Sequence, residues 1–277
     1  MSFDTVWFLS DYGLEDEFVG VVKAVIRAIA PHVVVGDVTH QIAPHDTRAG
    51  ALALARSMQY LTLFPAVVLA VVDPGVGSDR RAVAVEAGDA TAEGGGGPAA
   101  VLVGPDNGLL ASAVAMVGGA RRAVSLTNDA YHLPAPGATF AGRDLFAPVA
   151  AHLCAGVDLA ELGDLVDPIT LLPGILPLSR QEDGAVTGEA LWVDRFGNVQ
   201  LNVDPDELLL MDDPLELRFG EQTRTAVRVR CYADLRVGQI GLVTDSYGLV
   251  SIALDRHSAA EELRIHAGDG VSIKAAG

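Results

Sequence analysis

Apolar and polar positions divide the chain into two parts with different patterns. Up to about residue 146, short apolar runs without alternation are separated by helix-length segments. Such runs are typical of strands buried on both faces by helices, so this part predicts an α/β domain with a Rossmann-like, mostly parallel sheet. The expected strands are 6–10, 33–38, 66–72, 82–86 and 101–103, and the expected helices are 16–29, 47–59, 107–117 and 143–155.

The C-terminal part has short runs with turn residues between them, which predicts a small all-β domain, a barrel or sandwich. Prolines and glycines interrupt the periodicity at 172–184. We therefore expect an α/β N-terminal domain at 1–172, a linker at 173–184 and a β-barrel C-terminal domain at 185–277. The expected strands of the second domain are 187–193, 199–203, 215–219, 225–229, 240–244, 249–254 and 270–273.

Four consecutive glycines, Gly94–Gly97, lie between two expected strands. A phosphate-binding loop would end in Lys-Ser/Thr and continue into a helix, and neither feature follows these glycines. We therefore interpret 88–100 as a flexible hairpin tip.

Composition and charge limit the classes of partner that the chain is expected to bind. The 277 residues carry a formal net charge of −17 and only two lysines, which argues against nucleic acid and modestly favours a cationic small molecule. The longest apolar run, 64–72, is far shorter than the roughly 20 residues of a membrane span, so we expect no membrane partner.

Cys154 and Cys231 are far apart in sequence, and the N-terminus lacks the basic region of a signal peptide. A cytoplasmic location is expected.

Acidic residues follow several expected strands, including Asp11, Asp73 and Asp106. A single aspartate at such a place is commonly a turn former or helix N-cap, and the segment 73–81, DPGVGSDRR, is equally consistent with a surface turn held by a salt bridge. Several carboxylates at one edge of a sheet favour a ligand site, because ligands bind beyond the carboxyl ends of parallel strands. The histidine spacing does not favour a metal site, and a Gly-x-Ser-x-Gly elbow is absent.

Longer motifs carry a resemblance to a known family. They are FLSDYG at 8–13, VVDPGVGSDRR at 71–81, GPDNGLL at 104–110, TFAGRDLFAPVAAHL at 139–153, WVDRFGNVQLNV at 192–203, SYGLVSIAL at 246–254 and SAA at 258–260. In these motifs the chain resembles the S-adenosyl-L-methionine (SAM) hydroxide adenosyltransferases, which are adenosine-forming SAM hydrolases related to fluorinase and chlorinase. The resemblance implies SAM as substrate, adenosine and L-methionine as products, no cofactor, and a homotrimer with sites between subunits.

The implied reaction is a nucleophilic substitution at C5′ in which water or hydroxide displaces methionine. A sulfonium leaves as a neutral thioether, so the main requirement is a positioned, partly deprotonated water in line with the C–S bond. The resemblance assigns this water to Asp73 and Arg80, and the family spacing favours Arg80 over Arg81. It implies that the ribose hydroxyls bind Asp11 and that His45 lies over the sugar. The methionine ammonium binds Asp16 and Asp194, and the methionine carboxylate binds Ser246 and Tyr247. The adenine binds Asn198 and the backbone near Ala259, and Phe196 is also among the binding residues.

Two positions bear on the choice of nucleophile. The halogenases carry a tyrosine where this chain has Asp73, and an anionic carboxylate would repel a halide.

The hydroxide-using members read TFHGRD, whereas this chain has Ala141 at the histidine position. The alanine is either natural divergence or an engineered substitution that traps a ligand, and the intact neighbouring motifs favour the second interpretation. We expect binding with slow turnover. A non-catalytic SAM- or adenosine-binding protein and, less favoured, a SAM-dependent halogenase stay open as alternatives.

Overall fold

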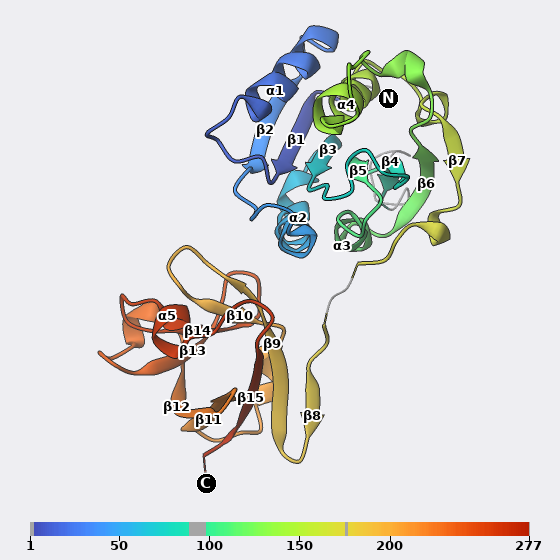
Figure 1. Cartoon of the computed structure of the whole chain (residues 1–277). Helices are drawn as coiled ribbons and strands as arrows, with labels where there is room; N and C mark the ends of the chain where they lie inside the picture. The colour runs from blue at the N-terminus through green and yellow to red at the C-terminus, as the bar shows by residue number, and fades with distance from the viewer. Residues whose placement is uncertain (1–2, 89–97, 175–176, 277) are drawn as a thin grey trace. The chain divides into compact units, whose positions relative to one another are not determined.

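The computed structural model describes residues 3–88, 98–174 and 177–276. The chain forms two compact units, Met1–Ile175 and Leu176–Gly277, and each is described by itself (Figure 1). Each unit has its own hydrophobic core.

The first unit is built on a seven-stranded sheet. Its strands are β1 (Thr5–Ser10), β2 (Val34–Thr39), β3 (Ala66–Val71), β4 (Ala82–Ala87), β5 (Ala100–Pro105), β6 (Ala120–Ser125) and β7 (Asp164–Val166). The order across the sheet is β2-β1-β3-β5-β4-β6-β7. β1, β2, β3 and β5 are parallel, β4 and β7 run the opposite way, and β6 again follows the direction of β5. The sheet is therefore mostly parallel, as predicted.

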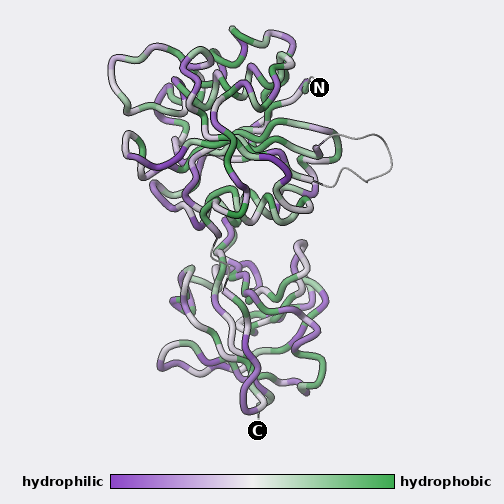
Figure 2. Tube along the Cα trace, turned by 90° about the vertical axis from the view of Figure 1, so that its right-hand side faces the viewer, coloured by the Kyte–Doolittle hydropathy of each residue, from purple (hydrophilic) through white to green (hydrophobic). Residues whose placement is uncertain are grey.

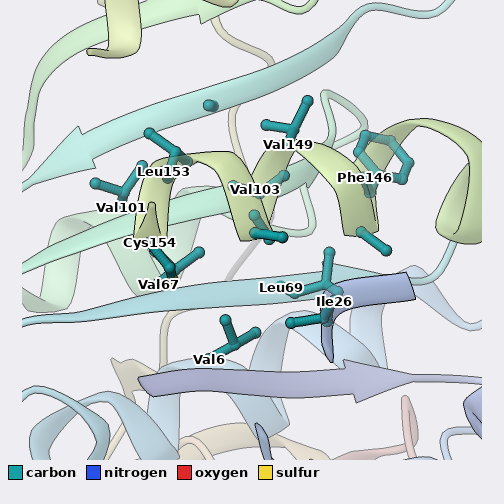
Figure 3. Packing of buried hydrophobic residues seen from close by; sticks show 14 of the residues in the cluster. Val6, Ile26, Val67, Leu69, Val101, Val103, Phe146, Val149, Leu153 and Cys154 are labelled. Atoms are coloured by element: carbon teal, nitrogen blue, oxygen red, sulfur yellow. The ribbon is translucent and has the colours of Figure 1, made fainter. Parts of the chain in front are cut away.

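Helices cover both faces of this sheet (Figure 1). The helices are α1 (Phe18–Ile29), α2 (Thr47–Leu61), α3 (Ala111–Met116) and α4 (Ala147–Cys154), with shorter turns η1 (Asp129–Tyr131), η2 (Gly142–Phe146), η3 (Leu159–Glu161) and η4 (Pro168–Thr170). Because strand side chains alternate between faces, Val67 and Leu69 pack with α1 and α4 (Figure 3). Val68 and Ala70 point to the other face and pack with α2 and α3. Burial on both faces explains why β3 is apolar throughout, and Figure 2 shows hydrophobic residues along the central strands.

The second unit is a closed barrel. Its strands are β8 (Arg180–Glu182), β9 (Ala185–Val193), β10 (Val199–Leu201), β11 (Leu215–Phe219), β12 (Gln222–Val229), β13 (Ile240–Thr244), β14 (Val250–Ala253) and β15 (Gly270–Ala275). They follow the order β10-β14-β13-β12-β11-β15-β9-β8, and pairing of β9 with β10 closes a ring of seven strands with β8 outside it. The helix α5 (Ala259–Leu263) and the turns η5 (Pro205–Leu208) and η6 (Tyr232–Asp234) complete the unit.

The fold class is confirmed, and the structure differs from the expected elements at a few places. Residues 180–182, expected in the linker, form β8 and pair with β9. The strands β6 and β7 were not predicted. β4 and β5 are antiparallel neighbours, and most of the glycine-rich segment 88–100, predicted to be a hairpin tip, lies outside the described residues. No helix in the described part of the chain is long and apolar enough to cross a membrane.

Candidate functional site

A pocket of about 570 Å³ lies in the first unit. The strands β1 and β3 are parallel neighbours in which Ser10 is paired with Val71, so the residues that follow them emerge at the same edge of the sheet. Asp11 and Asp73 both line the pocket, as do His45 and Ala141. The structure thus brings together four of the residues predicted for the site, at the place where an α/β sheet binds ligands.

Asp73 is held at the pocket wall by Arg80. The guanidinium Nε of Arg80 donates to both carboxylate oxygens, at 2.8 Å and 3.0 Å, and Nη2 donates to Oδ2. The Asp73 side chain is 5% exposed and the Arg80 side chain is 15% exposed. The Arg80 guanidinium also lies 5.4 Å from the ring centroid of Phe146. A forked pair of this kind fixes the orientation of the carboxylate. Asp73 is therefore presented to the pocket as a preoriented hydrogen-bond acceptor.

Arg81 belongs to a different ion pair. Its Nε donates to Asp106 at 2.8 Å, and its other nitrogens donate to the hydroxyl and carbonyl of Thr170. Asp106 also accepts from the backbone N–H of Leu172 at 2.8 Å. Neither Arg81 nor Asp106 lines the pocket that contains Asp73. This second pair ties β5 to the segment that follows η4.

Asp11 and His45 form the rim of the pocket near α2. The backbone N–H of His45 donates to Oδ2 of Asp11 at 2.9 Å, and His45 has a positive φ of 69° just before Asp46 caps the helix. This bond anchors the Asp11 carboxylate at the pocket edge. Asp16, by contrast, is exposed before α1 and lies outside the residues that line the pocket.

Tyr12 also lines the pocket and was not among the predicted site residues. Its ring makes edge contacts with Phe18 and Phe140, at centroid distances of 5.9 Å and 5.6 Å. Burial raises the pKa of the Tyr12 hydroxyl, and the carboxylates of Asp11 and Asp73 raise it further. The hydroxyl therefore stays protonated across the physiological range.

Ala141 lines the same pocket at the start of an irregular helix. It precedes the π-helical turn η2, and such turns are frequent at functional sites. The next residue is glycine, and a Cβ at Gly142 would collide with the Tyr12 hydroxyl where it lies now. His132 pairs with Asp129 at 3.3 Å and is not among the residues that line the pocket. Among the pocket-lining residues, His45 is therefore the one imidazole that the described part of the chain provides.

In the second unit, the predicted residues Asp194 and Asn198 belong to one tight loop between β9 and β10. Asp194 accepts from the backbone N–H groups of Phe196 and Asn198, at 2.8 Å and 2.9 Å, and from the Asn198 side chain at 2.8 Å. The carbonyl of Gly197 accepts from the backbone N–H of Ala260 at 2.9 Å, which joins the loop to the start of α5. Asn198 and the backbone near the buried Ala259 are thus brought together, whereas the Phe196 side chain is 78% exposed.

A second loop, between β13 and β14, carries Ser246 and Tyr247. Asp245 shapes it by accepting from the backbone N–H groups of Tyr247 and Leu249, at 2.8 Å and 3.2 Å. Burial raises the pKa of the Tyr232 hydroxyl, and the carboxylates of Asp194 and Asp245 near it, one from each loop, raise it further. The residues Tyr232 and Asp245 were missed, although the two loop sequences DRFG and DSYG share an Asp-x-aromatic-Gly pattern that could have identified Asp245.

The loop at Gly197 yields a stability prediction. Gly197 has a φ of 82°, and a Cβ there would collide with Ser258. We expect Gly197→Ala to lower the free energy of unfolding by about 2–4 kcal/mol, from the left-handed backbone and the collision together. Gly184→Ala is the matched control, because Gly184 has a φ of 74° with open space around it, so it should cost only about 1–2 kcal/mol. Denaturant unfolding of both variants measures the difference, and equal losses would contradict the packing of this loop against α5.

Comparisons with known proteins relate both units of the chain to one family. The family model described as SAM hydroxide adenosyltransferase N-terminal domain matches residues 6–163, and that of the C-terminal domain matches residues 188–272. A protein named (R)-S-adenosyl-L-methionine hydrolase from Salinispora tropica is 44% identical over 273 residues, which cover 98% of each chain. A fluorinase from an Actinoplanes species is more distant, at 27% identity over 96% of each chain. The crystal structure of an uncharacterized conserved protein from Thermotoga maritima aligns with a TM-score of 0.85 and 32% identity, over 97% of this chain and 99% of that one.

Proposed function

Because the chain belongs to the SAM hydroxide adenosyltransferase family, we propose that it is an enzyme that hydrolyses S-adenosyl-L-methionine to adenosine and L-methionine. The observation that carries the proposal is the preoriented Asp73 carboxylate, held by Arg80 at the wall of a pocket at the sheet edge. A carboxylate in this setting can accept a proton from water.

The proposed reaction is a single displacement at C5′. The oxygen of water forms a bond to C5′ while the C5′–S bond breaks, and the bonding electrons pass to sulfur. The water proton goes to Asp73, whose orientation is fixed by Arg80. Methionine leaves as a neutral thioether, so the leaving group needs neither a general acid nor a cofactor. Catalysis in this scheme depends on holding the water in line with the C–S bond.

The family resemblance implies a set of substrate contacts, which the loops of the two units support. In the first unit, Asp11 accepts hydrogen bonds from the ribose and His45 lies over the sugar. In the second unit, Asn198 and the backbone near Ala259 bind adenine. Asp16 and Asp194 bind the methionine ammonium, the segment Ser246–Tyr247 binds its carboxylate, and Phe196 is a further contact. Support for these assignments comes from the pocket at Asp11 and from the hydrogen-bonded loops at Asp194 and Asp245.

We further propose that the protein is a cytoplasmic homotrimer in which the second unit of one copy completes the site on the first unit of another. The family resemblance supports the assembly, and the free thiols of Cys154 and Cys231 support a reducing compartment. Light scattering should give the mass of three chains, and a monomer that turns over SAM at the full rate would exclude a shared site.

A second candidate is a protein that binds SAM or adenosine without chemistry, and Ala141 is the observation that favours it. Incubating the protein with SAM and following adenosine by chromatography separates the two functions. A hydrolase releases adenosine and methionine above the uncatalysed rate, whereas a binder does not. Parallel incubations with chloride and fluoride test for 5′-halogenated products, which the carboxylate of Asp73 should disfavour.

A further inference from the structure

The Tyr12 hydroxyl is a polar group of the reaction pocket that the proposed chemistry leaves without a role. Tyr12 lines the pocket together with Asp73 and Ala141. Its oxygen lies against the backbone of Gly142, so closely that a Cβ at that glycine would collide with it. Within the described residues the hydroxyl has no hydrogen-bond partner from the protein, so its proton is available to a ligand or water in the pocket.

The position of the ring is fixed by its neighbours. Phe8, Phe18 and Phe140 surround it with edge contacts, at centroid distances of 6.3 Å, 5.9 Å and 5.6 Å. Side chains held by packing on several sides lose little freedom when they bind a ligand, which is the condition for an effective preorganised donor.

The backbone of Tyr12 is held by a chain of polar groups that runs from two buried residues to the surface. Its N–H donates to the hydroxyl of Ser10 at 3.3 Å, and Ser10 is hydrogen-bonded to Nδ1 of His40 at 2.7 Å. The other ring nitrogen of His40 contacts Asp37 at 3.0 Å, and Lys23 completes the chain with an ion pair to Asp37 at 2.7 Å. Ser10 and His40 are almost fully buried. This chain connects two strands and α1 to the turn that carries Asp11 and Tyr12.

The electrostatic surroundings favour a hydroxyl that donates. Burial raises the pKa of Tyr12, the nearby carboxylates of Asp11 and Asp73 raise it further, and Arg80 opposes the shift. A tyrosine that keeps its proton can donate to an oxygen that becomes negative, but it cannot itself act as a base at neutral pH. The developing negative charge in this pocket is on the water that loses its proton to Asp73.

We propose that Tyr12 is a further catalytic residue, whose hydroxyl donates a hydrogen bond to the attacking oxygen while Asp73 accepts its proton. The inference rests on the proposed hydrolysis. The hydrogen bond strengthens as the oxygen becomes more negative, so it stabilises the transition state more than the bound substrate. Tyr12 keeps its own proton throughout, and the number of protons in the reaction is unchanged.

The test is the variant Tyr12→Phe, which removes the hydroxyl and keeps the ring. Because the hydroxyl makes no bond to the protein in the described residues, we expect unchanged thermal unfolding and unchanged adenosine affinity. The kcat for adenosine release from SAM should fall by roughly tenfold or more, with KM within about twofold of the parent. A higher KM with unchanged kcat would overturn the proposal, because the hydroxyl would then be a ground-state substrate contact. Unchanged kcat and KM would overturn it as well.

Two controls distinguish a failure of the role proposed for Tyr12 from a failure of the proposed hydrolysis. Tyr60→Phe removes the hydroxyl of an exposed tyrosine on α2 and should leave kcat unchanged. The same Tyr12→Phe comparison is made in the Ala141→His background, where faster turnover gives a larger signal. If neither background releases adenosine, the proposed function fails and the inference fails with it. If both release it and Tyr12→Phe has no effect, only the role of Tyr12 is excluded.

Discussion

Replacing Asp73 with asparagine is expected to lower the kcat for SAM hydrolysis by about 100-fold or more while adenosine still binds. The amide keeps the size of the side chain but cannot accept the proton of water at neutral pH. It also removes one charge of the ion pair with Arg80, whose guanidinium is only 15% exposed. A loss of roughly 1–3 kcal/mol in the free energy of unfolding should accompany the loss of rate. Initial rates of adenosine formation and a denaturation curve measure both effects.

Asp106→Asn provides the matched control for this variant. Asp106 is as buried as Asp73, with both side chains 5% exposed, and it pairs with the next arginine, Arg81. The control should lose similar stability and keep its turnover, because Asp106 does not line the pocket of Asp73. If Asp106→Asn lowered kcat as much as Asp73→Asn, the loss would reflect stability rather than a proton acceptor at Asp73.

Replacing Ala141 with histidine is expected to raise the rate of SAM hydrolysis by about 10- to 100-fold, with little change in the affinity for adenosine. Ala141 lines the pocket with Asp73, so an imidazole introduced there would be available to the water or to Asp73. It would supply a second proton acceptor whose ordinary pKa is near neutrality. Single-turnover rates, compared with the dissociation constant of adenosine, separate the two effects.

Ala141→Gln is the control for the histidine variant. Glutamine fills much of the same space and can donate a hydrogen bond, but it does not titrate. We expect it to leave the rate near that of the parent. An unchanged rate in Ala141→His would exclude a catalytic role for a side chain at this position, and an equal gain in both variants would assign the gain to packing.

The central strands of the first unit could be predicted because their side chains are buried on both faces of the sheet. Val67 to Val71 is apolar without interruption, since alternate residues pack against different helices. β6 was not predicted because Arg121 and Arg122 are exposed and break the apolar run. β7 and β8 are three residues long and largely exposed, so their pairing with a neighbouring strand defines them more than their composition does.

Part of the site was predictable because two of its residues follow strands whose burial is evident from the sequence. Asp11 and Asp73 follow buried parallel strands, and the parallel pairing of β1 with β3 places both at one edge. Tyr12 was not predictable, because an aromatic residue after a strand is equally consistent with core packing. Its proposed role depends on the π-helical turn at Gly142, which is more than a hundred residues away in the chain. Tyr232 likewise becomes a neighbour of Asp194 and Asp245 only through the pairing of β12, β13, β14 and β10, which lie side by side in the sheet.

The central claim is that water attacks C5′ of SAM in this protein. The most direct measurement is incubation with SAM in water enriched in oxygen-18, followed by mass spectrometry of both products. We expect adenosine to carry one labelled oxygen at the 5′ position, methionine to carry none, and formation of both to depend on Asp73. Adenosine without the label, or no adenosine above the uncatalysed rate, would contradict the account.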